Sequence, residues 1–256
     1  MKVFFNLKAL VFGSGAVGFG GWQLQKKFQF SDCHAEEYDY RWDTNWDGMS
    51  SVRNKGVRHI ILIRHGQYVT KTSDPAKKVL TELGRNQAKA LGVFLGEFTK
   101  SLDIPLTKIV ASTMVRATET CDIACGQFIT DKNILENIDY TDLIREGPPI
   151  LPEPPSSVYK PSDSEIRECQ TRLDKGFEKY FSRPLDDGST LEIYFCHGNV
   201  IRYYLCKFLQ LPLNAWLRFN IRHCSVTWIK LRGSGRVTCS AYGDAGFMPA
   251  EMLTTS

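Results

Sequence analysis

The chain has 256 residues, of which 43% are hydrophobic and 23% are charged, and its formal net charge is +4. This composition excludes wholesale disorder, and the length allows one large domain or two small ones with a sizeable core. The small net charge does not favour a nucleic-acid-binding protein, in which basic residues usually exceed acidic ones far more strongly.

The positive charge is concentrated at the N-terminus. The first 31 residues contain four lysines and no acidic residue, so residues 32–256 sum to zero. Residues 9–22 are an uninterrupted run of apolar and small side chains. As a helix this run would span about 21 Å, and the flanking Lys8 and Lys26 can extend its usable length to about 27 Å, near that of a bilayer core. We predict that residues 1–30 are a membrane anchor or targeting segment; a cleaved signal and a soluble tail are the alternatives.

Residues 31–55 are polar and show neither a helical nor a strand period. They nevertheless contain two of the five tryptophans, in a motif made up of Trp42, Asp43, Thr44, Asn45, Trp46 and Asp47. Leaving each indole in water costs about 2 kcal/mol or more. Either both tryptophans fold back onto their own domain, or the motif docks in a groove on a neighbouring subunit, where its aspartates face basic or amide donors. We favour the second alternative and predict a linker that assembles a homo-oligomer.

Strands and helices alternate from residue 56 onward. The predicted strands cover residues 58–64, 108–112, 191–196, 224–231 and 236–242, the last two joined as a hairpin. The predicted helices begin after Thr81, near Met114, after Ser162 or Ser164, and at Val200. This alternation predicts an α/β fold with a mostly parallel sheet and helices on both faces. Residues 148–161 hold six of the eleven prolines, so we expect a stiff loop there.

The eight cysteines are scattered without a Cys-x-x-Cys pair. Cys121 and Cys125 are four residues apart but have no histidine nearby, which makes them a poor zinc motif. We therefore expect free thiols, most of them buried, as is typical of a reducing compartment. Cys196 should fill the core, and His59 and His223 should be structural.

Polar residues follow three of the predicted strands at their carboxyl ends, where open parallel sheets bind ligands. These residues are Arg64, His65, Gly66, Ser112, Arg116, His197, Gly198 and Asn199. The arginines and histidines suit a phosphate dianion, because guanidinium groups offer forked donors and a neutral imidazole can act as nucleophile. Gly66 would let the backbone pass close to the phosphate. Asn199 would either donate to the phosphate or cap the following helix.

The order of these motifs resembles the histidine phosphatase (phosphoglycerate mutase-like) superfamily. The motifs that carry the resemblance are Arg64-His65-Gly66, Arg116, Arg145-Glu146-Gly147 and His197-Gly198. The resemblance covers roughly residues 56–246 and implies a three-layer sandwich with helices on both faces of the sheet. Residues 42–47, 64–68 and 243–249 also resemble a subfamily of mitochondrial serine/threonine-protein phosphatases with an N-terminal membrane segment.

The resemblance implies a two-step phosphoryl transfer. His65 would attack phosphorus and become phosphohistidine, and Glu146 matches the general acid that protonates the departing oxygen. The expected phosphate ligands are Arg64, Gly66, Arg116 and His197. No metal or cofactor is expected, because the guanidinium groups supply the positive charge.

Three functions are compatible with these features: a membrane-anchored protein serine/threonine phosphatase, a small-molecule phosphatase or sugar-phosphate mutase, and an adaptor. In mutases the Arg-His-Gly motif is commonly followed by Glu-Ser, whereas Gln67 and Tyr68 follow here, so we favour the first. Such a phosphatase would be located in a mitochondrial membrane, inner or outer. Its partners would be phosphoproteins and further copies of itself rather than nucleic acid. The expected parts are an anchor (1–30), a linker with the assembly residues Trp42, Asp43, Asn45, Trp46 and Asp47 (31–55), a catalytic domain (56–246) and a tail (247–256).

Overall fold

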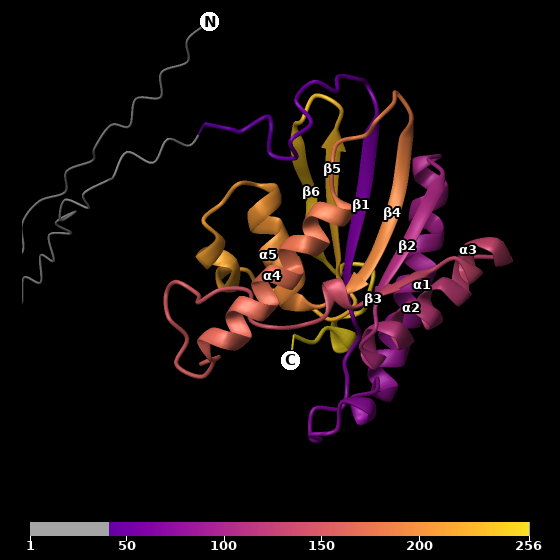
Figure 1. The fold of residues 1–256 in the computed structure, drawn as a ribbon. Helices are drawn as coiled ribbons and strands as arrows, with labels where there is room; N and C mark the ends of the chain where they lie inside the picture. The colour runs from indigo at the N-terminus through magenta and orange to yellow at the C-terminus, as the bar shows by residue number, and fades with distance from the viewer. Residues whose placement is uncertain (1–40, 256) are drawn as a thin grey trace, which may run out of the picture. The chain divides into compact units, whose positions relative to one another are not determined.

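The computed structural model describes residues 41–255 (Figure 1). The predicted anchor at residues 1–30 and the first ten residues of the predicted linker lie outside the described residues. Within residues 41–255, no helix combines the length and the apolar character needed to cross a membrane. From Trp42 onward the chain belongs to one structural unit.

Six strands form one sheet in the order β3-β2-β4-β1-β5-β6 (Figure 1). They are β1 (Val57–Arg64), β2 (Leu106–Ser112), β3 (Asp139–Thr141), β4 (Ser189–Cys196), β5 (Val226–Arg232) and β6 (Val237–Asp244). The pairs β1–β4, β2–β4 and β2–β3 are parallel, while β5 is antiparallel to both β1 and β6. The predicted mostly parallel sheet and the predicted hairpin are therefore confirmed. The sequence does not predict β3, because three residues are too few to show a period.

The helices begin close to the predicted positions. They are α1 (Glu82–Leu102), α2 (Val115–Phe128), α3 (Lys132–Glu136), α4 (Asp163–Tyr180) and α5 (Gly198–Phe208). Thr81 caps α1 by accepting the backbone N–H of Gly84, and Ser162 forms a capping box with Glu165 at the start of α4. The predicted start of α5 at residue 200 is two residues late, because the helix follows β4 without a loop and His197 is its N-cap residue.

Strand β1 shows why helices cover both faces of the sheet. Ile60 and Leu62 point into one hydrophobic core, and Ile61 and Ile63 point into another. All four are at most 1% exposed, so the strand is apolar on both of its faces. The first core is shared with α4 and α5, and the second with α1 and α2. The predicted three-layer sandwich is confirmed (Figure 1).

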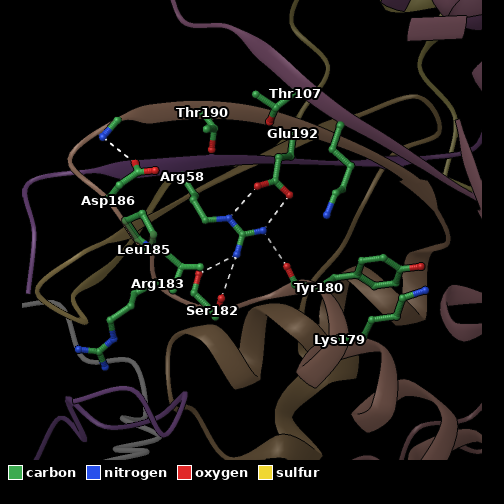
Figure 2. Close-up of a pocket in the computed structure, with 13 residues that line it drawn as sticks. Arg58, Thr107, Lys179, Tyr180, Ser182, Arg183, Leu185, Asp186, Thr190 and Glu192 are labelled. Carbon is green, nitrogen blue, oxygen red and sulfur yellow. Dashed lines mark hydrogen bonds and ion pairs between the residues drawn. The ribbon is translucent and has the colours of Figure 1, made fainter. Parts of the chain in front are cut away.

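A buried ion pair joins β1 to β4 at the end of the sheet where both strands begin. Figure 2 shows the Arg58 guanidinium held by both carboxylate oxygens of Glu192, at 2.7 and 2.8 Å. The same guanidinium donates to the backbone carbonyls of Ser182 and Tyr180, each at 2.8 Å. Because Glu192 also accepts the hydroxyl of Tyr194, both charged groups have hydrogen-bond partners although they are largely buried.

Part of the tryptophan motif packs on its own domain. The Trp46 indole Nε1 donates to the carbonyl of Gly235 at 2.8 Å, and its ring lies against Phe177 and Phe208. Asp47 accepts from Arg183 at 2.6 Å, and the two side chains are only 1% and 2% exposed. Within this chain Trp46 and Asp47 therefore pack on their own domain. Docking of the motif on a neighbouring subunit, the alternative that we favoured, stays a prediction.

The rest of the motif is less enclosed. Asp43 and Gln210 exchange two hydrogen bonds of 2.8 Å, which tie the motif to the end of α5. The Asn45 side chain accepts the backbone N–H of Ser50 and closes a turn. Trp42, in contrast, is 36% exposed. Residues 42–55 thus pack as part of the domain, and the assembly role of the motif stays a prediction.

We predict that Asp47→Asn lowers the free energy of unfolding by about 3 kcal/mol, because it leaves the buried Arg183 guanidinium without its counter-charge. Burial alone would raise the pKa of Asp47, but the hydrogen bonds from Arg183 outweigh it and the pKa lies below its usual value. The stabilisation is thus fully present above about pH 4 and is lost as the pH falls through the folded-state pKa.

Urea unfolding of the full-length chain, followed between pH 7 and pH 3, measures both effects. Glu97→Gln, which neutralises an exposed carboxylate on α1, is the matched control and should change stability by no more than about 0.5 kcal/mol. Equal losses in the two variants, or a loss in Asp47→Asn that does not diminish at acid pH, would contradict this account.

Candidate active site

The parallel pairing of β1 with β4 brings two histidines together. Arg64 is in register with Cys196, and the backbone N–H of His65 donates to the carbonyl of Cys196 at 3.1 Å. The next residue on each strand end is therefore a histidine, and the ring centroids of His65 and His197 are 5.1 Å apart. Both side chains are almost completely buried, at 2% and 0% exposure.

The hydrogen bonds of His65 define its tautomer. Its Nδ1 lies 2.8 Å from the carbonyl oxygen of Gly66, which can only accept a hydrogen bond. Its Nε2 lies 3.1 Å from Nε of Arg116, which can only donate one. Nδ1 therefore carries the hydrogen, and Nε2 holds a lone pair. Burial lowers the pKa of His65 well below its usual value, and the charges of nearby His197, Arg116 and Arg64 lower it further, so the ring is neutral.

Arg116 reaches His65 from the first turn of α2, which starts directly after β2. Its guanidinium also lies over the Tyr68 ring, 4.6 Å from the centroid. Thr120, one turn further along α2, accepts the backbone N–H of Gly66 at 3.0 Å. The helix therefore holds both the arginine and the loop that follows β1.

Gly66 is required by packing. A Cβ atom at this position would lie 2.7 Å from the carbonyl oxygen of Gly84 on α1. The structure shows close passage of the loop to α1. The close passage of the backbone to phosphate that we expect at Gly66 stays a prediction. A larger residue here would push the loop away from α1 and move His65.

His197 has one ring nitrogen paired and one free. Its Nε2 lies 2.8 Å from the hydroxyl oxygen of Ser112, which already accepts the backbone N–H of Met114 and can donate its own proton to Nε2. In that arrangement Nδ1 carries a hydrogen, and this buried atom has no acceptor among residues 41–255. Burial, followed by the charges of Arg116 and other arginines, lowers the pKa of His197 well below its usual value. A neutral donor without an acceptor is suited to an incoming anion.

Arg64 offers a second donor of this kind. Its Nη1 donates to the carbonyls of Ile221 and Thr255, at 2.7 and 2.6 Å, whereas its buried Nε has no partner within the described part of the chain. Burial lowers the pKa of Arg64 to about 10, against the opposing effect of Glu146. The guanidinium thus stays positively charged at neutral pH.

Glu146 lies within electrostatic range of both arginines. Burial raises the pKa of its carboxyl group, although Arg116, Arg64 and two backbone N–H groups oppose this effect. Those N–H groups belong to Gly147 and Asn199, at 3.1 and 3.5 Å from the carboxylate oxygens. A carboxyl group with a raised pKa keeps its proton to a higher pH than a solvated one, as a general acid requires.

The C-terminal residues and His223 contribute contacts at the site that no motif in the sequence predicts. His223, expected to be structural, is 1% exposed and its ring centroid lies 5.6 Å from that of His65. Its Nδ1 is 2.9 Å from the hydroxyl of Thr254, which also accepts from Gln87. Residues 252–255, assigned to a tail, therefore pack against the site. No sequence period or spacing signals these contacts, because they join residues distant along the chain.

Other expectations concern residues around the site. His59 stacks on Trp228, far from His65 in the strand, and burial lowers its pKa to about 4, as expected of a structural histidine. The described cysteines are free thiols, all buried except the half-buried Cys239, and Cys196 lies in the core as predicted. Residues 41–255 contain no group of three or more histidine, cysteine, aspartate or glutamate side chains placed to hold a metal ion.

Fold and site together define an enzyme of phosphoryl transfer, in which a neutral histidine lies beside buried arginines at the carboxyl ends of parallel strands. The chain belongs to the histidine phosphatase superfamily, whose branch 1 model matches residues 60–244. It is therefore a phosphatase, a hydrolase of the histidine phosphatase type.

The chain is similar to curated proteins along most of its length. It is 39% identical to the mitochondrial serine/threonine-protein phosphatase Pgam5 of Drosophila melanogaster over 239 residues, which cover 83% of this chain and 80% of the relative. The corresponding protein of Drosophila yakuba is 36% identical over 285 residues and is matched over 97% of this chain and 96% of its own.

Solved structures share the fold. A phosphoglycerate mutase from Plasmodium falciparum is 30% identical, with a TM-score of 0.51 over 73% of this chain and 91% of its own. A putative alpha-ribazole-5'-P phosphatase from Escherichia coli has a TM-score of 0.53 over 73% of this chain and 96% of its own, at 14% identity. At that identity the second likeness shows the fold alone.

Proposed function

We propose that this chain is a mitochondrial protein serine/threonine phosphatase that acts through a phosphohistidine intermediate. The observation that carries the proposal is the Nε2 lone pair of neutral His65, which lies among the donors of Arg64, Arg116 and His197. A nucleophile and the donors that would hold its target thus occupy one buried site.

In the first step, Nε2 of His65 attacks the phosphorus of a phosphoserine or phosphothreonine. The N–P bond forms as the bond from phosphorus to the side-chain oxygen breaks. Arg64, Arg116 and the Nδ1–H of His197 stabilise the charge on the phosphoryl oxygens. Glu146 gives its proton to the departing oxygen, so that an alcohol leaves rather than an alkoxide.

In the second step, the Glu146 carboxylate takes a proton from water, whose oxygen attacks phosphorus. The N–P bond breaks and its electron pair returns to Nε2 of His65. Inorganic phosphate leaves, and both Glu146 and His65 are restored to their starting states. The hydrogen on Nδ1 of His65, held by the Gly66 carbonyl, stabilises the ring while it carries the phosphoryl group.

The names of the relatives support the substrate class and the compartment. Two relatives that match the chain at 36–39% identity are named mitochondrial serine/threonine-protein phosphatases. The likeness to a phosphoglycerate mutase favours a second candidate, a small-molecule phosphatase or mutase. Gln67 and Tyr68 after the Arg-His-Gly motif support the protein substrate, because the ring of Tyr68 lies edge-on to His65 where mutases commonly carry a serine.

We also propose that residues 1–30 anchor the chain in a mitochondrial membrane and that the tryptophan motif assembles copies of it. The support for assembly is Trp42, which is 36% exposed and lies beside Thr44, Arg236 and Val237 in a shallow pocket. An exposed indole next to an apolar side chain is typical of an interface anchor. Trp46 and Asp47 would then act indirectly, by holding the motif on the domain.

The full-length chain should hydrolyse phosphoserine peptides, and His65→Asn should abolish the reaction while leaving the fold intact. Loss of the nucleophile removes the covalent step, so we expect a fall of at least about 1,000-fold in kcat/KM. Alkaline quenching during turnover should trap phosphohistidine in the parent protein and none in the variant. Faster conversion of phosphoglycerate than of phosphopeptides would support the second candidate, and turnover of neither, with no trapped phosphohistidine, would leave the adaptor role.

Glu146→Gln should lose activity selectively with poor leaving groups. We expect kcat/KM for a phosphoserine peptide to fall about 100-fold or more, and that for 4-nitrophenyl phosphate to change little, because nitrophenolate leaves without a proton. Since Glu146 must be protonated, peptide hydrolysis should fall as the pH rises through its raised pKa, and the variant should lack this decline. Glu136→Gln, an exposed carboxylate on α3, is the matched control; equal losses on both substrates would contradict the acid role.

Trp42→Ala should reduce the mass of the particle in light scattering without unfolding it. The side chain is the exposed part of the motif, so its removal should cost little folding stability. Trp46→Ala should in contrast destabilise the domain, because it removes the bond to Gly235 and the contacts with two phenylalanine rings. An unchanged mass in Trp42→Ala would count against assembly through this motif.

A further inference from the structure

Asn199 contacts residues 145–147, the loop that carries Glu146 and that we call the acid loop. Its expected donation to phosphate stays a prediction, whereas its expected capping of α5 is wrong, because α5 begins at Gly198 with His197 as its N-cap residue. The Nδ2 of Asn199 donates to the carbonyl of Gly147 at 3.3 Å, and its backbone N–H donates to Oε2 of Glu146 at 3.5 Å. One residue thus holds both the backbone and the carboxyl group of the acid loop.

Arg202 determines which way the Asn199 amide points. Its Nη1 donates to Oδ1 of Asn199 at 3.2 Å, one turn further along α5. A guanidinium group can only donate and the Gly147 carbonyl can only accept, so the amide must place Oδ1 toward Arg202 and Nδ2 toward Gly147. The reversed amide would face a donor with a donor and an acceptor with an acceptor.

The acid loop needs such contacts because no strand or longer helix holds it. Glu146 follows a single 3-10 turn (Asp142–Ile144) and precedes the proline-rich segment. From the other side, Arg172 of α4 donates to the carbonyl of Arg145 at 2.7 Å. A Cβ atom at Gly147 would lie 2.7 Å from the sulfur of Cys169 on α4, so the loop is pressed against that helix. Glu146 therefore lies in a segment clamped between α4 and α5.

The two contacts of the carboxyl group differ in strength. Oε1 accepts the backbone N–H of Gly147 at 3.1 Å, whereas Oε2 accepts that of Asn199 at the longer distance of 3.5 Å. The oxygen with the weaker donor keeps the greater share of its basicity. We therefore expect Oε2 to be the oxygen that takes up the proton, and it is the one that Asn199 contacts.

We propose that Asn199, oriented by Arg202, is a positioning residue that aims the Glu146 carboxyl group at the leaving oxygen. This inference rests on the proposed role of Glu146 as general acid. In the first step the proton moves from Oε2 to the departing side-chain oxygen while the P–O bond breaks. Misplacing a reacting group by about 1 Å can cost roughly 100-fold in rate, so a loop released on its α5 side would protonate poorly.

The test compares two substrates on the full-length chain. Asn199→Ala removes the bond to Gly147 but keeps Glu146, and it should lower kcat/KM for a phosphoserine peptide about 10- to 100-fold. The value for 4-nitrophenyl phosphate should change less than about threefold, because phosphate binding and the nucleophile are untouched. The decline of peptide hydrolysis at alkaline pH should also be weaker than in the parent protein. A merely structural role would lower both substrates together.

Three further variants complete the experiment. Asn133→Ala, an exposed asparagine on α3, is the matched control and should leave both rates unchanged. Arg202→Met removes the donor that orients the amide and should show the same selectivity to a smaller degree. If thermal unfolding shows that Asn199→Ala is not folded, the Arg202 variant provides the test. Glu146→Gln shows how far kcat/KM for the peptide falls when the acid itself is lost.

The outcomes separate this inference from the proposed function. Selective loss in Glu146→Gln and in Asn199→Ala supports both. Selective loss in Glu146→Gln, with equal or no loss on the two substrates in the Asn199 and Arg202 variants, overturns the positioning role alone. Equal loss on both substrates in Glu146→Gln overturns the acid role, and the positioning role with it.

Discussion

The site depends on one constraint, the parallel register of β1 with β4. Because Arg64 lies opposite Cys196, both strands end at the same level and each is followed by a histidine. A shift by one residue would turn one of these histidines toward the wrong face of the sheet. The register is held by eight paired positions along the strands and by the buried pair of Arg58 and Glu192 at their beginning. The relative position of His65 and His197 therefore depends partly on an ion pair at the other end of the two strands.

Charge and burial at this edge of the sheet act in the same direction on the histidines. Burial disfavours imidazolium, and the neighbouring arginines disfavour it further, so His65 and His197 are neutral. At Glu146, burial raises the pKa and the arginines lower it, and burial has the larger effect. The result is a neutral nucleophile beside a carboxyl group with a raised pKa and permanently charged guanidinium groups. An arriving phosphate dianion would compensate the positive charge of Arg64 and Arg116.

Much of this could be predicted from the sequence. The apolar run of β1 and the spaced apolar positions of the helices show their periods directly, and these elements were placed within a few residues. The histidines and arginines at strand ends could be identified because parallel strands place their carboxyl ends together. Residues that only tertiary packing brings to the site could not be predicted. His223, Thr254 and the contact of Asn199 with the Glu146 loop show no local sequence pattern. The contacts of Trp46 within its own domain could not be predicted either, because the sequence does not show that Gly235 and the rings of α4 and α5 lie where the indole can reach them.

The placement of the tryptophan motif has a consequence for access. Trp46 binds the turn between β5 and β6, and Asn54 donates to the carbonyl of Pro184 before β4 begins. Both contacts lie at the end of the sheet where β1 and β4 start, and the site lies where they finish (Figure 1). Residues 42–55 thus pack at the end of the sheet opposite His65 and do not cover the site. A protein surface that presents a phosphorylated side chain to His65 would therefore not have to displace the tryptophan motif.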